Sequence, residues 1–313
     1  MIVAKNIVEI REAVKSYGSK KIGPISLSLA SGESVGLLGP NGSGKTTCIR
    51  MMMGLVKPSS GQVTVMGGDP IRNHKGALAH VGYSPELPNL PTFMTAYSLL
   101  SFTASLLGIR EPHGQVMDVL DRVGLTAYAH FKIGKMSKGM IQRLSVAQAL
   151  IGEPKLLILD EPMIGVDPAG AAHFREMFRE FTSRGGTILL SSHTMSEVES
   201  LCSRVVMLHR GKYVFGGSVD EALESYVKSR TLWVEASGLT GEILNEVSKL
   251  AGVFSLEKTA NGFQASVTVS PDPRPLIADT LVRSGCKLYS MAYESNLLEK
   301  VYINALAEAD RNG

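Results

Sequence analysis

The chain has 313 residues, of which 44% are hydrophobic and 19% charged, so it can bury a full core and is neither disordered nor fibrous. Its length suits one large domain or two ordinary ones. The formal net charge of +3 is slight for this length and gives no argument for nucleic-acid binding, which would require a strongly basic surface.

The three cysteines indicate a reducing compartment. Cys48, Cys202 and Cys286 are odd in number and far apart, which suits neither a disulfide framework nor the spacing of a metal site. Cys48 is interpreted as a buried structural thiol, and the alternative is a thiol sensitive to alkylation.

Neither an export signal nor a membrane span is expected. The first residues, MIVAKNIVEIREAV, carry charges within their apolar stretch. The one segment worth testing as a span, Phe93–Leu107, has 15 residues and is rich in serine and threonine, so it is too short and too polar. We therefore expect a soluble chain that reaches a membrane only through a partner.

The N-terminal part reads as short strands. Residues 7–29 are expected to form two of them, because Ile25–Leu29 alternates strictly between apolar and polar residues. Gln62–Met66 repeats the pattern with Val63 and Val65 facing inward.

Residues 34–50 read as an apolar strand, a glycine-rich turn and the start of a helix, and they contain the phosphate-loop pattern G-x-x-x-x-G-K-[ST]. The glycines let successive backbone N–H groups point inward, and the helix that begins at about Thr46 directs its positive end to the same place. Lys45 can then reach the β- and γ-phosphates, and the Thr46 hydroxyl can bind Mg²⁺. The alternative, a chance glycine turn, does not account for the strand before it and the helix after it. The predicted nucleotide-binding residues are Gly39, Pro40, Asn41, Gly42, Ser43, Gly44, Lys45, Thr46 and Thr47.

Residues 92–152 read as helical, with apolar residues at three- and four-residue spacing. Two strands of buried type follow, Lys155–Asp160 and Thr187–Ser191, with a helix between them. Strand, helix and strand in this order imply a parallel sheet. Arg204–His209 and Tyr213–Phe215 complete this first domain.

The pattern of expected strands and helices changes after residue 217. Ser218 and Glu221 form a capping box that begins a short helix, which continues to about Val227. The βαββαβ order that follows predicts a small ferredoxin-like α+β domain. The expected strands are Leu232–Glu235, the hairpin of Val253–Lys258 and Phe263–Val269, and Lys287–Met291. The expected helices are Gly241–Leu250, Pro275–Ser284 and a last helix, Asn296–Ala307, which is capped by Asn296 and Glu299.

Two carboxylates end the apolar strand LLILD. Asp160 is placed to hold Mg²⁺ directly or through water, and Glu161 is placed to polarise the water that attacks the γ-phosphate. An acidic pair at a strand end is common by chance, so its significance depends on the motifs around it.

Those motifs resemble the ATP-binding cassette (ABC) family of ATPases. Residues 137–150, SKGMIQRLSVAQAL, are similar to the signature segment of that family, LSGGQ-x-QR-x-x-x-A-x-AL. Ser137 and Gly139 keep the serine and second glycine of the pattern, whereas Met136, Lys138 and Met140 depart from it. The SKGM form resembles the branch of exporters whose membrane subunits are separate chains.

The resemblance assigns roles to four further residues. Asp167 matches the D-loop, and His193 matches the switch histidine that senses the γ-phosphate, although such a histidine alone would be read as a surface residue. Tyr17 matches the aromatic residue that stacks on adenine, with an ordinary strand aromatic as the alternative. Glu86 occupies the position of the Q-loop glutamine, from which it could reach Mg²⁺ or the attacking water.

The resemblance covers about residues 2–217 and implies a P-loop cassette (α/β) with an antiparallel β subdomain and an α-helical subdomain at about 92–152. Residues 1–217 are then the ATP-binding domain and residues 218–313 an accessory α+β domain for dimerisation or regulation. The resemblance implies that Lys45, Glu161 and His193 are catalytic and that Thr46, Asp160 and Glu86 bind Mg²⁺. It also implies that the segment Ser137, Lys138, Gly139 and Met140 acts in trans, on the nucleotide of the opposite subunit.

The implied function is an ATP-hydrolysing transporter subunit that pairs with a second ATPase subunit, identical or not. It would lie on the cytoplasmic face of the cell membrane, bound to polytopic permease subunits through residues 92–135 and the loop Glu86–Pro91. Most apolar residues of this segment are interpreted as internal packing, and Phe93 and Met94 as exposed docking contacts. Direction is expected to be export, and the transported substance stays open because its site belongs to the membrane partner.

Two other functions compete with this one. The first is a soluble ABC-type ATPase that acts on ribosomes or DNA. ATPases of this type that act on ribosomes usually carry two cassettes, whereas this sequence has one phosphate loop. Those that act on DNA contain long inserted coiled coils, whereas only 50 residues without a heptad pattern separate Glu86 from Ser137. A nucleotide or small-molecule kinase would leave the segment around Ser137 unexplained.

Overall fold

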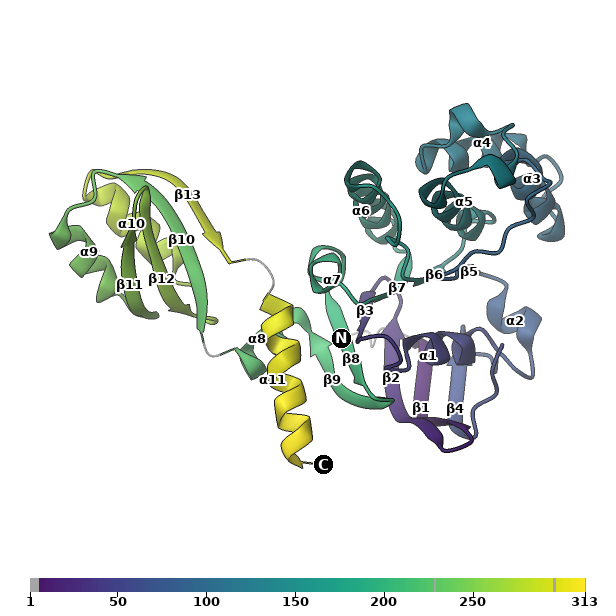
Figure 1. Ribbon diagram of the computed structural model, residues 1–313, viewed down its shortest axis with the longest axis horizontal. Coiled ribbons are helices and arrows are strands. Elements are labelled where there is room, and N and C mark those ends of the chain that lie inside the picture. Colours follow the sequence, from purple (N-terminus) through teal and green to yellow (C-terminus); the bar gives the residue numbers. More distant parts are fainter. Residues whose placement is uncertain (1–5, 228, 295–296, 313) are drawn as a thin grey trace. The chain divides into compact units, whose positions relative to one another are not determined.

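The computed structural model describes residues 6–227, 229–294 and 297–312. The chain divides into two compact units, Met1–Gly217 and Ser218–Gly313 (Figure 1).

The first unit contains an antiparallel three-stranded sheet with the order β2-β1-β4. β1 and β2 are long strands rather than the two short ones that the sequence predicted. A bulge between Ile10 and Ala13, where Glu12 has a φ of 46°, interrupts the alternation of inward- and outward-facing residues in β1. The strand continues beyond this bulge to Tyr17. The bounds are β1 Asn6–Tyr17, β2 Lys20–Ala30 and β4 Ser60–Val65.

A six-stranded sheet with the order β5-β6-β7-β3-β8-β9 carries the predicted parallel pairing. Every residue of β3, β6 and β7 is buried, as expected for central strands covered on both faces. The bounds are β3 Ser34–Leu38, β5 Val81–Ser84, β6 Leu156–Asp160, β7 Thr187–Ser192, β8 Arg204–His209 and β9 Lys212–Ser218.

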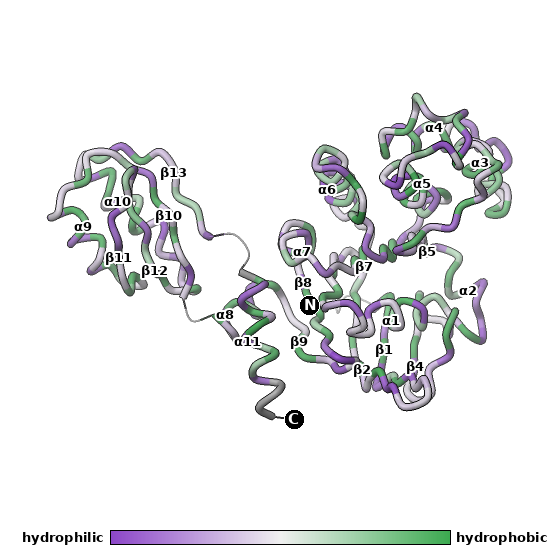
Figure 2. The backbone as a smooth tube through the Cα atoms, in the orientation of Figure 1, coloured by the Kyte–Doolittle hydropathy of each residue, from purple (hydrophilic) through white to green (hydrophobic). Residues whose placement is uncertain are grey.

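Helix α1 (Lys45–Met52) belongs to the apolar core that joins these two sheets. Its buried side chains Ile49 and Met52 share one cluster with Ile10 of β1 and Leu37 of β3. Three more helices of this unit are α2 (His74–Leu78), α6 (Pro168–Ser183) and α7 (Met195–Leu201). Hydrophobic and hydrophilic residues alternate around α6 (Figure 2), whose buried side chains include Phe174 and Phe178.

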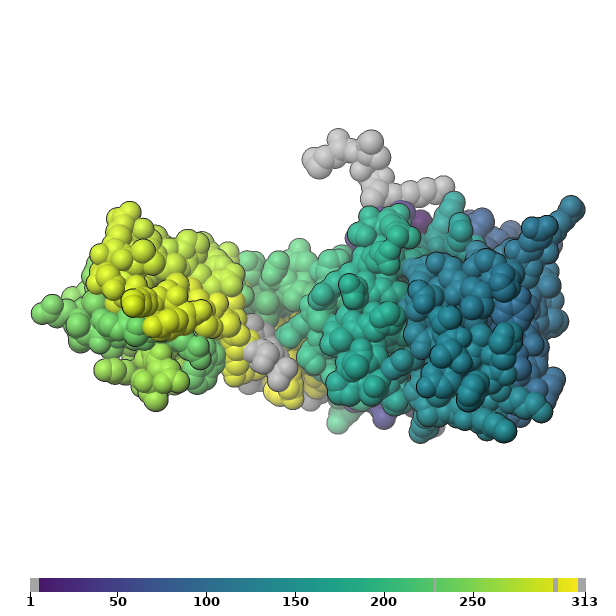
Figure 3. All heavy atoms as spheres, turned by 90° about the horizontal axis from the view of Figure 1, so that it is seen from above, coloured from purple at the N-terminus to yellow at the C-terminus, as the bar shows by residue number. Residues whose placement is uncertain are grey.

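The predicted helical segment is present as α3 (Ala96–Leu106), α4 (His113–Arg122) and α5 (Lys138–Leu150). Two single turns of 3₁₀ helix, Thr126–Tyr128 and Ile133–Lys135, connect α4 to α5. The atoms of these helices lie together at one side of the first unit and are coloured blue in Figure 3.

In the second unit, α8 (Val219–Tyr226) packs against α11 (Leu297–Asn312). The capping box of Ser218 and Glu221 is confirmed, with both reciprocal hydrogen bonds present. α11 continues five residues beyond the predicted end at Ala307. Glu299 lies in its first turn, and the predicted cap Asn296 lies outside the described residues.

The rest of this unit follows the predicted order of elements and forms an antiparallel sheet with the order β11-β12-β10-β13. Leu232, Val234 and Phe263 face a core that α9 and α10 cover, whereas Trp233 on the opposite face is 47% exposed. The bounds are β10 Ser229–Ser237, α9 Gly241–Ser248, β11 Val253–Thr259, β12 Gly262–Thr268, α10 Arg274–Arg283 and β13 Lys287–Tyr293. None of the helices in the described ranges combines the length and apolar character that a membrane crossing requires.

Candidate active site

The phosphate-loop sequence lies between the end of β3 and the start of α1, as its pattern predicts. Gly39 has a φ of 154°, and a Cβ there would lie 2.4 Å from the carbonyl oxygen of Leu208. Gly44 has a φ of 112° and is the N-cap of α1, which begins at Lys45, one residue earlier than predicted. Glycine is therefore required at both positions, by space at the first and by backbone conformation at the second.

The loop borders a hollow of about 300 Å³. Two buried polar atoms at this hollow, Ser43 Oγ and Glu161 Oε1, accept or donate no hydrogen bond, although Glu161 Oε1 forms an ion pair with Lys45. Buried polar groups are nearly always satisfied, so these two fit a site completed by a polar ligand. The residues that line the hollow are Lys20, Ile22, Pro40–Thr47, Glu86 and Glu161.

Lys45, Glu161 and His193 form a connected group beside the loop. Lys45 Nζ donates to the carbonyl oxygen of Gly39 at 2.6 Å and lies 3.2 Å from Glu161 Oε1. His193 Nδ1 lies 2.8 Å from the second oxygen, Glu161 Oε2. Lys45 and Glu161 are only 5% and 4% exposed, and each of these buried charges has an ionic or hydrogen-bonding partner. The structure thus brings the three predicted catalytic residues together.

Asp160, at the end of β6, is 1% exposed, and this burial raises its pKa above the usual range. Hydrogen bonds from Ser191 and Thr46 oppose that increase. Ser191 Oγ donates to Asp160 Oδ1 at 2.5 Å and accepts from the backbone N–H of Glu161 at 3.0 Å. Ser191 therefore holds the Asp160 carboxylate and the backbone of Glu161, a role that the sequence analysis missed because β7 is 30 residues away.

Glu161 has a φ of 51°, in the left-handed region that non-glycine residues rarely adopt. This backbone turns the chain out of β6 immediately after Asp160, so that consecutive carboxylates have different surroundings. Strain of this kind concentrates at functional sites.

The signature segment lies elsewhere in the first unit. Ser137 is the N-cap of α5, and its Oγ accepts from the backbone N–H of Met140 at 3.2 Å. Ser137 and Lys138 are exposed and Gly139 is half-buried. None of them lines the hollow beside Lys45.

Of the other predicted site residues, Glu86 lines the hollow, and Tyr17 and Asp167 do not. Tyr17 is 45% exposed at the end of β1, with Lys15 Nζ 5.4 Å from its ring centre. Lys20, three residues further along the same hairpin, does line the hollow and was missed. A search for basic residues next to the adenine-stacking position would have found it.

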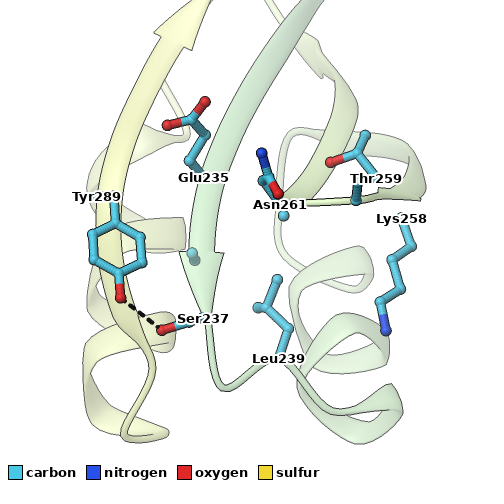
Figure 4. Close-up of a pocket in the computed structure, with 10 residues that line it drawn as sticks. Glu235, Ser237, Leu239, Lys258, Thr259, Asn261 and Tyr289 are labelled. Atoms are coloured by element: carbon cyan, nitrogen blue, oxygen red, sulfur yellow. Dashed lines mark hydrogen bonds between the residues drawn. The ribbon is translucent and has the colours of Figure 1, made fainter.

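Cys48 is fully buried in α1, and burial raises the pKa of its thiol to about 12. This confirms the interpretation of Cys48 as a structural thiol. A separate open hollow of about 520 Å³ lies in the second unit, where the hydroxyl groups of Ser237 and Tyr289 are 3.0 Å apart (Figure 4). Its charged side chains, Glu235 and Lys258, are both exposed.

Comparison with known proteins agrees with this geometry. A family model described as ABC transporter matches residues 22–164. YhcH of Bacillus subtilis (strain 168), an ABC transporter ATP-binding protein, is 32% identical over 307 residues, which cover 97% of each chain. The chain belongs to the ABC transporter ATP-binding protein family. Nod factor export ATP-binding protein I of Burkholderia lata is 34% identical over 283 residues, covering 90% of this ABC protein and 91% of the relative.

A solved ATP-binding subunit of an ABC transporter has the same fold, with a TM-score of 0.66 and 28% identity over 70% of this chain and 93% of that one. The resemblance seen in the sequence is therefore confirmed. This ABC protein is the ATP-binding subunit of an ABC transporter, its homologues include exporter ATPases, and it hydrolyses ATP.

Proposed function

We propose that this ABC ATPase works as a pair in which each copy completes the other's reaction centre. The observation that carries the proposal is the location of Ser137 and Gly139, which lie outside the hollow that their own Lys45 and Glu161 line. A serine hydroxyl and backbone N–H groups at the start of a 13-residue helix suit a γ-phosphate. That phosphate then belongs to the nucleotide of the opposite subunit, which binds between the two copies.

Thr46 and Asp160 are proposed to hold Mg²⁺, with Glu86 as a further ligand. Asp160 is held by Ser191 at one oxygen and has a hard carboxylate of the kind that Mg²⁺ prefers. When bound by these residues, Mg²⁺ would supply positive charge that neutralises the phosphate oxygens of the nucleotide. Its positive charge would also lower the pKa of Asp160, which burial raises in the structure described here.

Within each site, Glu161 acts as the general base for the attacking water, and Lys45 binds the phosphates. Glu161 needs a fixed orientation to accept a proton, and His193 supplies it through the contact to Oε2. Once the γ-phosphate is present, Lys45 has a stronger anionic partner than Glu161. This exchange frees Glu161 Oε1 for the water.

The pair is proposed to drive separate polytopic membrane subunits on the cytoplasmic side, in the direction of export. Docking would use residues 92–135 and the loop Glu86–Pro91. Phe93 is 78% exposed, whereas Met94 is half-buried and its carbonyl oxygen accepts from Ile133, so Phe93 is the better docking contact. Exposed Leu87, in the Glu86–Pro91 loop, adds apolar surface.

We assign residues 1–217 to the ATP-binding domain and residues 218–313 to an accessory domain with a ferredoxin-like sheet. The βαββαβ order and the strand order β11-β12-β10-β13 support that assignment. Its role is proposed to be dimerisation or regulation, by analogy with other ATPases that carry appended domains.

Substituting Glu161→Gln tests the pairing. Glutamine keeps the shape of the side chain but cannot accept the proton, so turnover should fall by about 10²- to 10⁴-fold. ATP should still bind and trap a dimer, visible by analytical ultracentrifugation. Lys45→Ala is the matched control, because it should weaken nucleotide binding itself. Normal steady-state turnover of the Glu161→Gln chain would show that Glu161 is not the general base. A strictly monomeric chain with bound ATP would refute the pairing.

Co-purification from detergent-solubilised membranes tests the transporter partnership. A polytopic protein that remains bound to this ATPase would support it and would identify the permease. Recovery of the chain only with ribosomes or DNA would contradict it.

A further inference from the structure

The start of α5 packs directly on the loop that joins β6 to α6. A Cβ at Gly139 would lie 2.9 Å from the carbonyl oxygen of Gly165, closer than real Cβ contacts. The absence of a side chain at Gly139 therefore lets the first turn of α5 touch this loop. The same loop begins at Glu161, so it connects the general base of one site with the signature segment proposed to act on the other.

An ion pair ties the two elements together one turn further along α5. Arg143 Nη2 donates to Asp167 Oδ1 at 2.6 Å, with side chains 23% and 64% exposed. The same Asp167 oxygen accepts from the backbone N–H of Gly170 at 3.2 Å, which makes Asp167 the N-cap of α6. A Cβ at Gly170 would lie 2.3 Å from Arg143 Nη2, so glycine leaves room for the guanidinium group.

Gly139 and Arg143 are four residues apart and hence lie on the same face of α5. That face meets the loop at two points, one at Gly165 and one at Asp167. Two contacts along a helix restrict both its position and its rotation, and they add to the packing of α5 on β5. Ser137, which caps the same helix, is restricted with it.

We infer that Arg143 is a positioning residue that sets the location of Ser137 for the opposite subunit's nucleotide. It touches neither the hollow nor the reacting groups of its own site. This inference rests on the proposed function, because only a nucleotide held between two copies gives the position of Ser137 a catalytic consequence. Arg143 was not among the residues that the sequence analysis selected.

The test compares Arg143→Gln with Arg184→Gln in the full chain. Arg184 also pairs with a carboxylate, Glu180, but it lies at the end of α6 opposite to Asp167. Arg143→Gln should lower kcat and weaken ATP-dependent dimerisation by about tenfold each, the size expected for one partly desolvated charge-assisted hydrogen bond. Binding of a fluorescent ATP analogue to the monomer should change by less than about twofold, since Lys45 is untouched. Arg184→Gln should leave all three quantities unchanged.

Two further variants separate positioning from simple structural support. Asp167→Asn removes the charge but keeps a good N-cap, so α6 remains capped while the ion pair is lost. It should reproduce the Arg143→Gln defect, and the double variant should be no worse than either single variant. Arg143→Lys should restore part of the dimerisation.

Dimerisation is measured in the Glu161→Gln background with ATP. Turnover is measured in the chain that keeps Glu161. If the Glu161→Gln parent dimerises, and Arg143→Gln changes neither this dimerisation nor the turnover of the chain that keeps Glu161, the inference is overturned and the proposed function stays intact. A parent that stays monomeric overturns both. If Arg143→Gln fails to fold, Asp167→Asn decides in its place, and normal dimerisation of that variant refutes the positioning role.

Discussion

Replacing Ser191 by alanine should destabilise the first unit chiefly through Asp160. The substitution removes the hydroxyl that donates to Asp160 Oδ1 at 2.5 Å and accepts from the Glu161 N–H. That N–H keeps a second acceptor, the backbone oxygen of Ser191 at 3.2 Å, so it is not left unsatisfied. The loss is therefore that of one buried hydrogen bond to a charged group, about 1.5–3 kcal/mol.

The penalty should decrease as the pH falls. Burial already raises the pKa of Asp160, and loss of the Ser191 hydrogen bond, which lowers it, raises it further. Because the raised pKa lies above the unfolded value of about 3.9, the folded chain binds the proton first and gains stability relative to the unfolded chain as pH falls through the raised pKa. The variant has the higher folded pKa and gains more, so its deficit is largest near neutral pH.

Native-state hydrogen exchange of the β6 and β7 amides measures this free energy, with the β10 and β12 amides of the second unit as an internal reference. Ser84→Ala is the matched control, because it breaks a buried hydrogen bond of 2.8 Å between two neutral hydroxyls, Ser84 and Ser145. The control should lose about 1 kcal/mol at every pH. Equal losses in the two variants, with no pH dependence for Ser191→Ala, would refute the reasoning.

Two other perturbations follow from the packing and the charges. Gly82→Ala should destabilise the first unit by about 1–3 kcal/mol or more, since its Cβ would lie 2.0 Å from the carbonyl oxygen of Ala149 between β5 and α5. Urea unfolding followed by circular dichroism measures the loss, and a variant as stable as the parent would contradict the prediction. Gly114→Ala, where the added carbon meets open space, is the control. Asp272→Asn should weaken the second unit at pH 7 by less than about 1 kcal/mol, a value reduced for solvent screening. Hydrogen bonds from Arg274 lower the pKa of Asp272, so the stabilisation is present above the unfolded pKa of about 3.9 and is lost as the pH falls from that value through the lower folded pKa. Exchange of the β13 amides measures that difference, and a penalty that persists in acid would exclude the ionic cause.

Local motifs explain why much of the site could be predicted. The phosphate loop and the pair Asp160 and Glu161 each combine a strand end with the residues that directly follow it, so chain order alone places them at one edge of a parallel sheet. His193 follows β7 for the same reason, and the structure places it 2.8 Å from Glu161.

The contacts that the sequence did not predict join residues far apart in the chain. Arg143 pairs with Asp167 across 24 positions and Ser191 with Asp160 across 31, and no spacing rule connects either pair. Each contact forms only because the folded chain places α5 beside Asp167 and β7 beside Asp160. The length of β1 was underestimated because a bulge at Glu12 interrupts the alternation that marks a strand. The end of α11 was placed too early because no glycine or proline stops the helix at Ala307.

The half-exposed indole of Trp233 on the open face of β10 makes the two units optically distinguishable. The chain has one tryptophan, so selectively excited emission arises from the second unit and none from the cassette. A spectral change on adding ATP would then mean that occupancy of the phosphate loop alters the surroundings of this ring in the second unit. An unchanged spectrum beside intact hydrolysis would mean that the indole is insensitive to turnover.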